Sequence, residues 1–411
     1  MHRSNRRSVL KASAGGALAL SLQPHLFAGP VRLSAPVKLG LVGAGRQGRA
    51  ILAELAKFPD VTMAAVCDLD DRRLKSSKRR AKGANFYASL AAMLEGEKDL
   101  DGVLVATPSH LHRAPAEEAL AAGKHVYCEA PLATTLEDAR AIAKAARSSG
   151  SVFQTGLLGR ANPVYTLART FVKAGAIRDV ISMRAQHRVK NSWVIPASEP
   201  ERQKRLNWRL DPELSLGLIG ELGIHQFDVM HWYTGQYPTS VRATGSVQAW
   251  KDGRTVADTV HAQLTFPKGV QLAWEGTLGN TYGEVHEELL GTMGSVRLAW
   301  SHGWMFKEAD AATQGWEVYA NRQQFHNDEG ITLIADATKL ASQGKLTDGV
   351  GLEHPALYYG METFLKSITE EANVVCGADE GLRAAAVAIQ THKALISGEE
   401  VLIGEDILKT E

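Results

Sequence analysis

The chain has few cysteines and almost no net charge. Cys67, Cys128 and Cys376 lie far apart among 411 residues and form no CxxC pair, which excludes a disulfide framework and gives no indication of a zinc site. Lys and Arg (46) balance Asp and Glu (45), so the net charge of +1 gives no reason to expect nucleic acid or an acidic membrane surface as a partner. After the first 35 residues, no apolar run reaches the roughly 18 residues of a membrane span. The remaining composition, 45% hydrophobic and 22% charged, is that of an ordinary globular protein long enough for two domains.

The first 35 residues differ from the rest. Arg3, Arg6 and Arg7 precede an apolar segment of small residues over 12–22, which is the layout of an export signal. The stretch NRRSVLK resembles a twin-arginine signal, which is an address read by a receptor rather than an anchor. We therefore expect residues 1–35 to direct export, with a periplasmic location and no membrane anchor. A frayed basic tail or a short signal anchor is the alternative, and the poor cleavage sequence at 26–28 leaves the mature start open.

The body of the chain shows two successive patterns. From Val37, strand-like and helical runs alternate with a period of roughly 25–35 residues, which is typical of βαβ units. Strands are expected at 38–42, 61–67, 102–106, 125–128 and 151–155, and helices at 47–57, 70–81, 114–122 and 136–149. After about residue 160, longer alternating runs at 240–250, 258–266, 270–277 and 296–300 predict a mostly antiparallel sheet. Helical patterns return at 358–371 and 380–397.

A glycine-rich turn lies between the first strand and the first helix. It consists of Gly43, Ala44, Gly45, Arg46, Gln47 and Gly48. Glycines in this place allow a tight turn and let the backbone approach a pyrophosphate, which the helix N-terminus then binds. A turn of purely structural value is the alternative.

Asp68 gives the glycine turn its context. It stands at the end of the second expected strand, where a carboxylate accepts hydrogen bonds from ribose hydroxyls. A carboxylate repels a 2′-phosphate, so the pattern favours NAD over NADP. Arg72 and Arg73 lie close by and weaken that preference.

Two further strand ends carry polar residues. Thr107, Pro108, His110 and His112 follow one strand, and Glu129 follows the next. In an open α/β sheet, ligands bind at this edge. Together with the glycine turn, these segments resemble the glucose–fructose oxidoreductase / inositol dehydrogenase (Gfo/Idh/MocA) family, and the resemblance runs from Val37 to the C-terminus.

The resemblance implies an α/β fold followed by an α+β fold. A Rossmann domain at 36–158 would bind NAD, and an open-sheet, mostly antiparallel domain at 159–411 would bind a sugar, with C-terminal helices packing back across both. The strand-end residues and Gln154 would contact the cofactor. Because the family's open sheets usually pack face to face, a dimer or tetramer is also implied.

A later segment, 217–228, resembles the family's substrate-side motif Asp-x-Gly-x-His-x-x-Asp and places His225 at the catalytic histidine. A histidine titrates near neutrality and can take a hydroxyl proton as hydride leaves the same carbon. On a regular α-helix, Glu221 and Asp228 fall within about 60° of His225 and can orient it. A metal site formed with His231 is a weaker alternative, because His231 lies about 240° around the helix from His225.

Two positions depart from the family pattern. Glu221 stands where the family usually has Asp, and Ala130 stands where the lysine of its Glu-Lys-Pro motif is expected. Some members that lack this lysine resemble NAD-dependent glycosidases, which oxidise a sugar transiently and then reduce it back. The other explanation is that the role of the lysine passed to His225 or to a tyrosine.

The substrate side is less well defined. Arg160 falls where the family's chain crosses between domains, and Trp208, Arg209 and Asp228 complete our candidate sugar contacts. A wider polar and aromatic set could also bind a sugar, although a structural role fits its members equally well. It contains Arg188, Lys190, Asn191, Trp193, Tyr282 and His286. The expected function is hydride transfer between a sugar carbinol carbon and tightly bound NAD. The alternatives are a redox-assisted glycosidase and a non-catalytic, nucleotide-binding sugar sensor.

Overall fold

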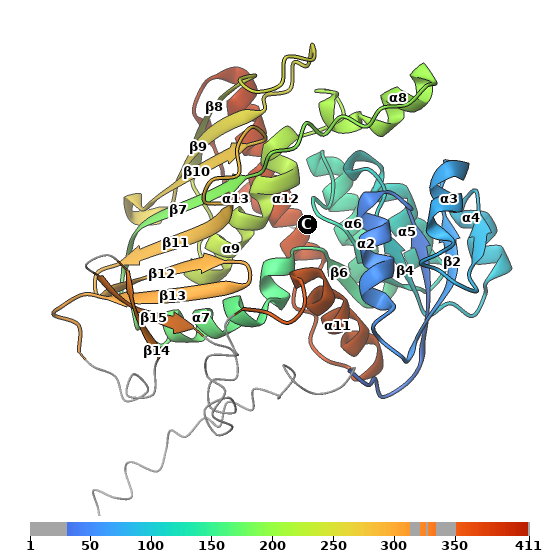
Figure 1. Ribbon diagram of the computed structural model, residues 1–411, viewed down its shortest axis with the longest axis horizontal. Helices are drawn as coiled ribbons and strands as arrows, with labels where there is room; N and C mark the ends of the chain where they lie inside the picture. Colours follow the sequence, from blue (N-terminus) through green and yellow to red (C-terminus); the bar gives the residue numbers. More distant parts are fainter. Residues whose placement is uncertain (1–30, 313–320, 326–327, 334–350, 410–411) are drawn as a thin grey trace, which may run out of the picture.

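Two β-sheets organise the molecule, and each belongs to its own half of the chain (Figure 1). The computed structural model describes residues 31–312, 321–325, 328–333 and 351–409. The expected export signal lies almost wholly outside these residues. Within the described part, no helix is both long and apolar enough to cross a membrane.

The first sheet is parallel and has six strands in the order β3-β2-β1-β4-β5-β6. Its strands are β1 (Val37–Val42), β2 (Val61–Cys67), β3 (Asn85–Tyr87), β4 (Gly102–Val105), β5 (His125–Cys128) and β6 (Phe153–Thr155). The central strands are apolar on both faces because helices cover both faces. The order reverses between β1 and β4, which in a doubly wound sheet is the point where a dinucleotide binds. This is a Rossmann fold.

The helices of this half are α2 (Arg46–Leu55), α3 (Asp71–Ser77), α4 (Leu90–Gly96), α5 (Arg113–Ala121) and α6 (Leu136–Ser149). The two ends of α6 illustrate how capping residues set the bounds of these helices. Thr135 caps its first turn by accepting from the N–H of Asp138, and Gly150 ends it in the left-handed conformation.

The second sheet is mostly antiparallel and has ten strands in the order β14-β15-β13-β12-β11-β7-β10-β9-β8-β16. Its strands are β7 (Val180–Arg188), β8 (Ser240–Ser246), β9 (Thr259–Thr265), β10 (Gln271–Thr277), β11 (Val285–Gly291), β12 (Gly294–Ala299), β13 (His302–Lys307), β14 (Asn321–Phe325), β15 (Asp328–Leu333) and β16 (Val401–Leu402). Among the described strands of this sheet, only β7 and β10 pair in parallel.

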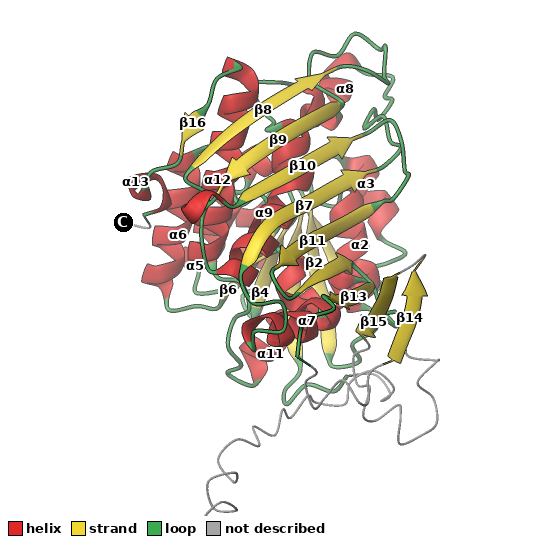
Figure 2. Cartoon of the chain, turned by 90° about the vertical axis from the view of Figure 1, so that its left-hand side faces the viewer, coloured by secondary structure: helices red, strands yellow, loops and turns green. Residues whose placement is uncertain are grey.

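Helices cover one face of the second sheet, and the opposite face faces the viewer in Figure 2 without a helix over it in the described part. The remaining helices are α7 (Pro163–Lys173), α8 (Pro200–Leu206), α9 (Ile224–Thr234), α11 (Ala356–Thr369), α12 (Ala378–Ser397) and α13 (Glu405–Leu408). The long α12 packs against α6 of the Rossmann half and against α9 and β8 of the second half, and α11 packs against α2 (Figure 1). These two helices therefore join the halves.

Candidate active site

The glycine turn after β1 has the geometry of a dinucleotide-binding loop. Gly43 has a φ of +95°, and a Cβ on Gly48 would lie 1.9 Å from the carbonyl oxygen of Gly43. Any side chain at Gly48 would therefore push the helix off the strand. Gly45 precedes α2 and provides no side-chain cap, so the N–H groups of the turn that begins at Arg46 are left for a ligand. This arrangement fits the pyrophosphate of NAD.

Asp68, at the end of β2, is held beside this turn. Its Oδ2 accepts the N–H of Ala44 (2.7 Å), and its Oδ1 accepts the N–H of Asp70 (2.8 Å). The guanidinium of Arg73 lies 3.9 Å from Oδ2. The carboxylate is thus fixed where the ribose of a bound dinucleotide is expected, with one cation next to it.

The segment after β4 forms a short helical turn, Ser109–Leu111. Both ring nitrogens of His112, which is buried, lie at hydrogen-bond distance from backbone carbonyls, Nδ1 from Pro131 (2.9 Å) and Nε2 from Thr107 (3.0 Å). His112 therefore ties the segment after β4 to the segment after β5. Burial lowers its pKa.

His110 lies on the other side of the same turn. Its ring packs against Trp208 of the second half, with 5.5 Å between ring centroids. Its Nδ1 has no hydrogen-bond partner among the described residues, and burial lowers its pKa. Trp208 is only 5% exposed and also carries the Arg209 guanidinium over its ring at 4.4 Å.

Glu129, at the end of β5, is buried and strongly hydrogen-bonded. Its Oε1 accepts from Gln47 Nε2 (2.9 Å) and from the Tyr127 hydroxyl (3.2 Å). Burial raises the pKa of Glu129 to about 7, although these two donors oppose the shift. A Cβ on Gly156 would come within 2.8 Å of Glu129 Oε2, so only glycine fits at that position. The structure thereby brings together Gln47 of the glycine turn and Glu129.

Gln154, on β6, points toward α11. Its Nε2 donates to the carbonyl of Gly360 (2.9 Å) and to the Thr363 hydroxyl (3.1 Å). Its Oε1 is buried and has no partner among the described residues.

The helix that carries His225 is not a regular α-helix. A π-helical turn, Ile219–Gly223, directly precedes α9. The 100° spacing that we used between Glu221 and His225 does not apply across this turn, because a π-turn is wider than an α-turn, but the charge of Glu221 still acts on His225. Close packing accompanies the turn, since a Cβ on Gly220 would lie 2.5 Å from Leu216 Cβ and one on Gly223 would lie 3.0 Å from the Trp274 ring.

The two carboxylates near His225 each bind other groups. Glu221 accepts from Arg209 Nε (2.7 Å) and from the Ser109 hydroxyl of the Rossmann half (2.7 Å). Asp228 forms a buried, bidentate ion pair with Arg160, with its shortest contact at 2.7 Å. Both carboxylates still contribute negative charge near the His225 ring, which opposes the lowering of its pKa by burial.

His225 itself is half-buried, and its Nδ1 has no hydrogen-bond partner among the described residues. Two groups that sequence reasoning missed lie beside it. The Trp300 ring packs edge-to-face on it with 6.4 Å between centroids. His187, near the end of β7, has its pKa lowered to about 4 by burial and by the charge of His225. No motif pointed to either residue, because His187 on β7 and Trp300 in the turn after β12 lie far from His225 in the sequence.

The wider polar set is dispersed. Arg188 pairs with Glu275 (2.8 Å), and His286 Nδ1 lies 3.1 Å from the carbonyl of Gly283. Lys190 is exposed, and Tyr282 is 81% exposed. Asn191 Oδ1 accepts the N–H of Trp193 (2.9 Å). Their side-chain contacts described above do not involve His225, but the backbone carbonyl of His286 accepts from Nε2 of Gln226, the residue that follows His225 (3.0 Å).

The metal alternative receives no support from the described residues. No group of three or more His, Cys, Asp or Glu side chains among them is arranged to hold a metal ion. His231 instead stacks on Tyr237, with 3.6 Å between ring centroids.

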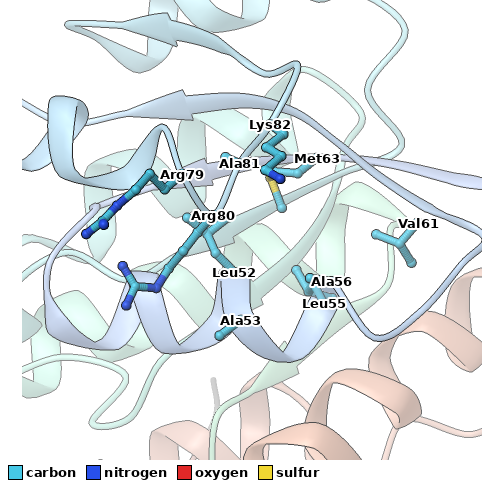
Figure 3. Close-up of a pocket in the computed structure, with 10 residues that line it drawn as sticks. All are labelled: Leu52, Ala53, Leu55, Ala56, Val61, Met63, Arg79, Arg80, Ala81 and Lys82. Carbon is cyan, nitrogen blue, oxygen red and sulfur yellow. The ribbon is translucent and has the colours of Figure 1, made fainter.

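A pocket of about 500 Å³ lies elsewhere in the Rossmann half, between α2, β2 and residues 79–82. Figure 3 shows its apolar wall from α2 and β2 and the side chains of Arg79, Arg80 and Lys82. No predicted site residue lines it.

Comparison with known proteins places this geometry in a family. Residues 37–157 match the oxidoreductase family with an NAD-binding Rossmann fold, and residues 165–297 match the Gfo/Idh/MocA C-terminal domain. The chain is 29% identical to 2,7-anhydro-N-acetylneuraminate hydratase of Escherichia coli (strain K12) over 64% of this chain and 67% of that protein. It is 34% identical to 1,5-anhydro-D-fructose reductase of Ensifer adhaerens over 49% of this chain and 58% of that protein.

Solved structures share the fold. Levoglucosan dehydrogenase in complex with NADH and levoglucosan superimposes with a TM-score of 0.70 at 21% identity, covering 90% of this chain and 99% of that one. The glycine turn, the Asp68 carboxylate and the two matched domains agree with one another. The chain therefore belongs to the Gfo/Idh/MocA family and is an NAD-dependent oxidoreductase.

Proposed function

We propose that the protein transfers hydride between a sugar carbinol carbon and NAD, with His225 as the acid/base group. The observation that carries this proposal is the contact between the two halves. Ser109 of the Rossmann half donates to Glu221 of the π-turn that leads into His225. This contact holds the edge where NAD binds close to a histidine with a free ring nitrogen.

The electrostatics suit a general base. Burial lowers the pKa of His225, so the ring is neutral at pH 7 and can accept a hydroxyl proton. Glu221 and Asp228 are held rigidly by their own partners, and their charges favour the imidazolium that forms. NAD, when bound, accepts the hydride from the same carbon.

Ala130 leaves the expected lysine position without a cation. Two arginines of the site are themselves paired with carboxylates, Arg209 with Glu221 and Arg160 with Asp228. We therefore assign proton transfer to His225 rather than to a replacement lysine. Trp208 and Arg209 remain our candidates for direct sugar contacts, whereas Arg160 and Asp228 act by fixing α9.

Two incubations of the full chain test the dehydrogenase proposal. Levoglucosan and myo-inositol are each added with NAD, and 1,5-anhydro-D-fructose is added with NADH. The expected result is a sugar-dependent change in nicotinamide absorbance. The names of the relatives, which include a reductase of 1,5-anhydro-D-fructose, motivate this panel. A cofactor whose absorbance responds to no sugar in either direction would favour the sensor.

A redox-assisted glycosidase is the second candidate. Two observations favour it: the absent lysine, and a relative named as a hydratase, since adding water involves no net oxidation. A glycosidase would release the aglycone from nitrophenyl glycosides without accumulating NADH. A dehydrogenase would accumulate NADH without releasing the aglycone.

The location and assembly are further proposals. We propose that residues 1–35 direct twin-arginine export and that the uncovered face of the second sheet packs against a second copy. That face carries paired charges, including Arg188 with Glu275 and Arg297 with Glu288 (3.7 Å), which suit a polar interface. Light scattering at low and high salt tests the dimer, since a charged interface weakens as salt screens it.

A further inference from the structure

Trp300, in the turn between β12 and β13, has an unusual backbone conformation. Its φ is +50°, in the left-handed region where a bulky side chain is strained. Strained residues persist only where their surroundings hold them, and they concentrate at ligand-binding and active sites. The groups that hold Trp300 therefore indicate whether this conformation serves a site.

Two buried side chains fix the backbone of Trp300. Asn162 Nδ2 donates to its carbonyl oxygen (2.6 Å), and its own N–H donates to the Tyr165 hydroxyl oxygen (3.2 Å). Neither Asn162 nor Tyr165 is accessible to solvent. The Tyr165 hydroxyl in turn donates to the carboxylate of Glu287 (2.5 Å), which is also fully buried, on β11. The turn is thus held from the interior of the second half.

The same network reaches His225 from a second direction. Gln226, the next residue of α9, donates through Nε2 to Glu287 Oε1 (3.0 Å). Glu287 therefore connects the backbone of Trp300, through Tyr165, with the helix that carries His225. One buried carboxyl group sets the relative position of the indole and the imidazole.

The indole is partly exposed and packs against the ring of His225. The two rings meet edge-to-face, at an interplanar angle of 70°. The indole also packs against the Tyr165 ring, at 5.8 Å between centroids. An aromatic ring held beside an acid/base histidine is suited to pack against the C–H face of a sugar ring, with the sugar hydroxyls left free for polar partners.

We propose that Trp300 is a specificity-determining residue whose indole packs against the sugar while His225 exchanges the hydroxyl proton. Tyr165 and Glu287 are positioning residues that hold the indole in place. This inference deepens the proposed function and rests on it for the identity of the ligand as a sugar.

The test combines binding and turnover on the full-length, NAD-loaded protein. Levoglucosan, myo-inositol and D-glucose are titrated by calorimetry into wild type, Trp300→Phe, Trp300→Ala and Tyr165→Phe, and any sugar that binds is assayed for kcat and KM. We expect Trp300→Ala to raise Kd and KM about tenfold and Trp300→Phe to raise them about threefold, as lost aromatic packing predicts. Tyr165→Phe should raise KM more than it lowers kcat, with NAD affinity unchanged.

Trp304→Phe is the matched control. Trp304 lies on β13, four residues farther along, and stacks on His302 at 5.8 Å. It should leave sugar affinity unchanged. Thermal unfolding of every variant separates local from global effects, and Trp300→Phe, which keeps an aromatic ring, covers the case in which Trp300→Ala does not fold.

The outcomes distinguish this inference from the proposed function. Wild type that oxidises a sugar while both Trp300 variants keep its KM overturns the inference alone. Sugar binding that depends on Trp300 without any hydride transfer overturns the dehydrogenase proposal and supports the inference. No binding of any of the three sugars to wild type counts against both.

Discussion

At the scale of single residues, His225 provides the sharpest prediction. His225→Ala should lower kcat/KM by about 10²–10⁴, because it removes the proposed general base, while NAD affinity stays unchanged because the glycine turn and Asp68 lie in the other half. His231→Ala, on the same helix but stacked on Tyr237, is the control and should keep full activity. The acid limb of kcat/KM in wild type should lie below pH 6.5, since burial lowers the pKa of His225. Activity of His225→Ala within about tenfold of wild type would remove this residue from the mechanism.

Glu287 provides a second residue-scale prediction, on stability. Burial raises the pKa of Glu287 from 4.5 to about 7, so the folded protein holds a proton that the unfolded chain releases at a lower pH. The stabilisation is complete below pH 4.5 and is lost as the pH rises through 7, by about 3 kcal/mol in total. The neutral variant Glu287→Gln should therefore lose less stability than wild type between pH 5 and pH 8, as measured by urea unfolding. Parallel pH profiles for the two proteins would contradict the assigned pKa.

At the scale of elements, the Rossmann half was largely predictable. Each of its strands except β3 was expected within two residues, because buried parallel strands are continuous apolar runs bounded by turn residues. β3 escaped because Asn85–Tyr87 is only three residues long and partly exposed. β6 begins at Phe153 rather than at residue 151.

For the second half, the mostly antiparallel sheet was predicted, but many of its individual strands were not. Six of its described strands were not expected: β7, β11, β13, β14, β15 and β16. In β7, for example, Arg184 and Gln186 alternate with the buried Met183 and Ala185, but the strand ends in His187-Arg188, where the apolar alternation stops. Its parallel pairing with β10 depends on contacts between segments far apart in sequence, which no local pattern records. The π-turn was also missed; Gly223 within it packs on Trp274 of β10, a contact that no local pattern records.

The element-scale prediction concerns the buried ion pair between Arg160 and Asp228, which joins the turn that contains Arg160 to helix α9. Asp228→Asn should lower the free energy of unfolding by about 3–5 kcal/mol, because it leaves the Arg160 charge buried without a partner. The double variant Arg160→Met/Asp228→Leu should recover most of that loss, since it removes both charges. Glu400→Gln, which breaks the exposed pair with Arg242, should cost less than about 1 kcal/mol. If Asp228→Asn left stability intact but reduced kcat/KM, Asp228 would be a sugar contact rather than part of the frame.

At the scale of the whole molecule, the order of the chain combines an expected export signal with a dinucleotide site. The two halves are joined by α12, which packs against α6 and α9, and by α11, which packs against α2. If the proposed export takes place, the reaction cycle depends on where the protein is located.

The twin-arginine export that we propose for this chain carries folded proteins, so NAD would be loaded in the cytoplasm and transported with the chain, and no NAD pool is expected outside to replace it. An enzyme in that position must return the hydride, either to a second substrate or to the first. We therefore predict that NAD copurifies with the protein, survives dialysis and is not consumed as product accumulates. Mass spectrometry of the released nucleotide, before and after incubation with sugars and nitrophenyl glycosides, measures all three properties. Protein that is active only with excess free NAD and forms one NADH per product would instead be an ordinary exchanging dehydrogenase, and the absent lysine at Ala130 would then have no connection with a closed redox cycle.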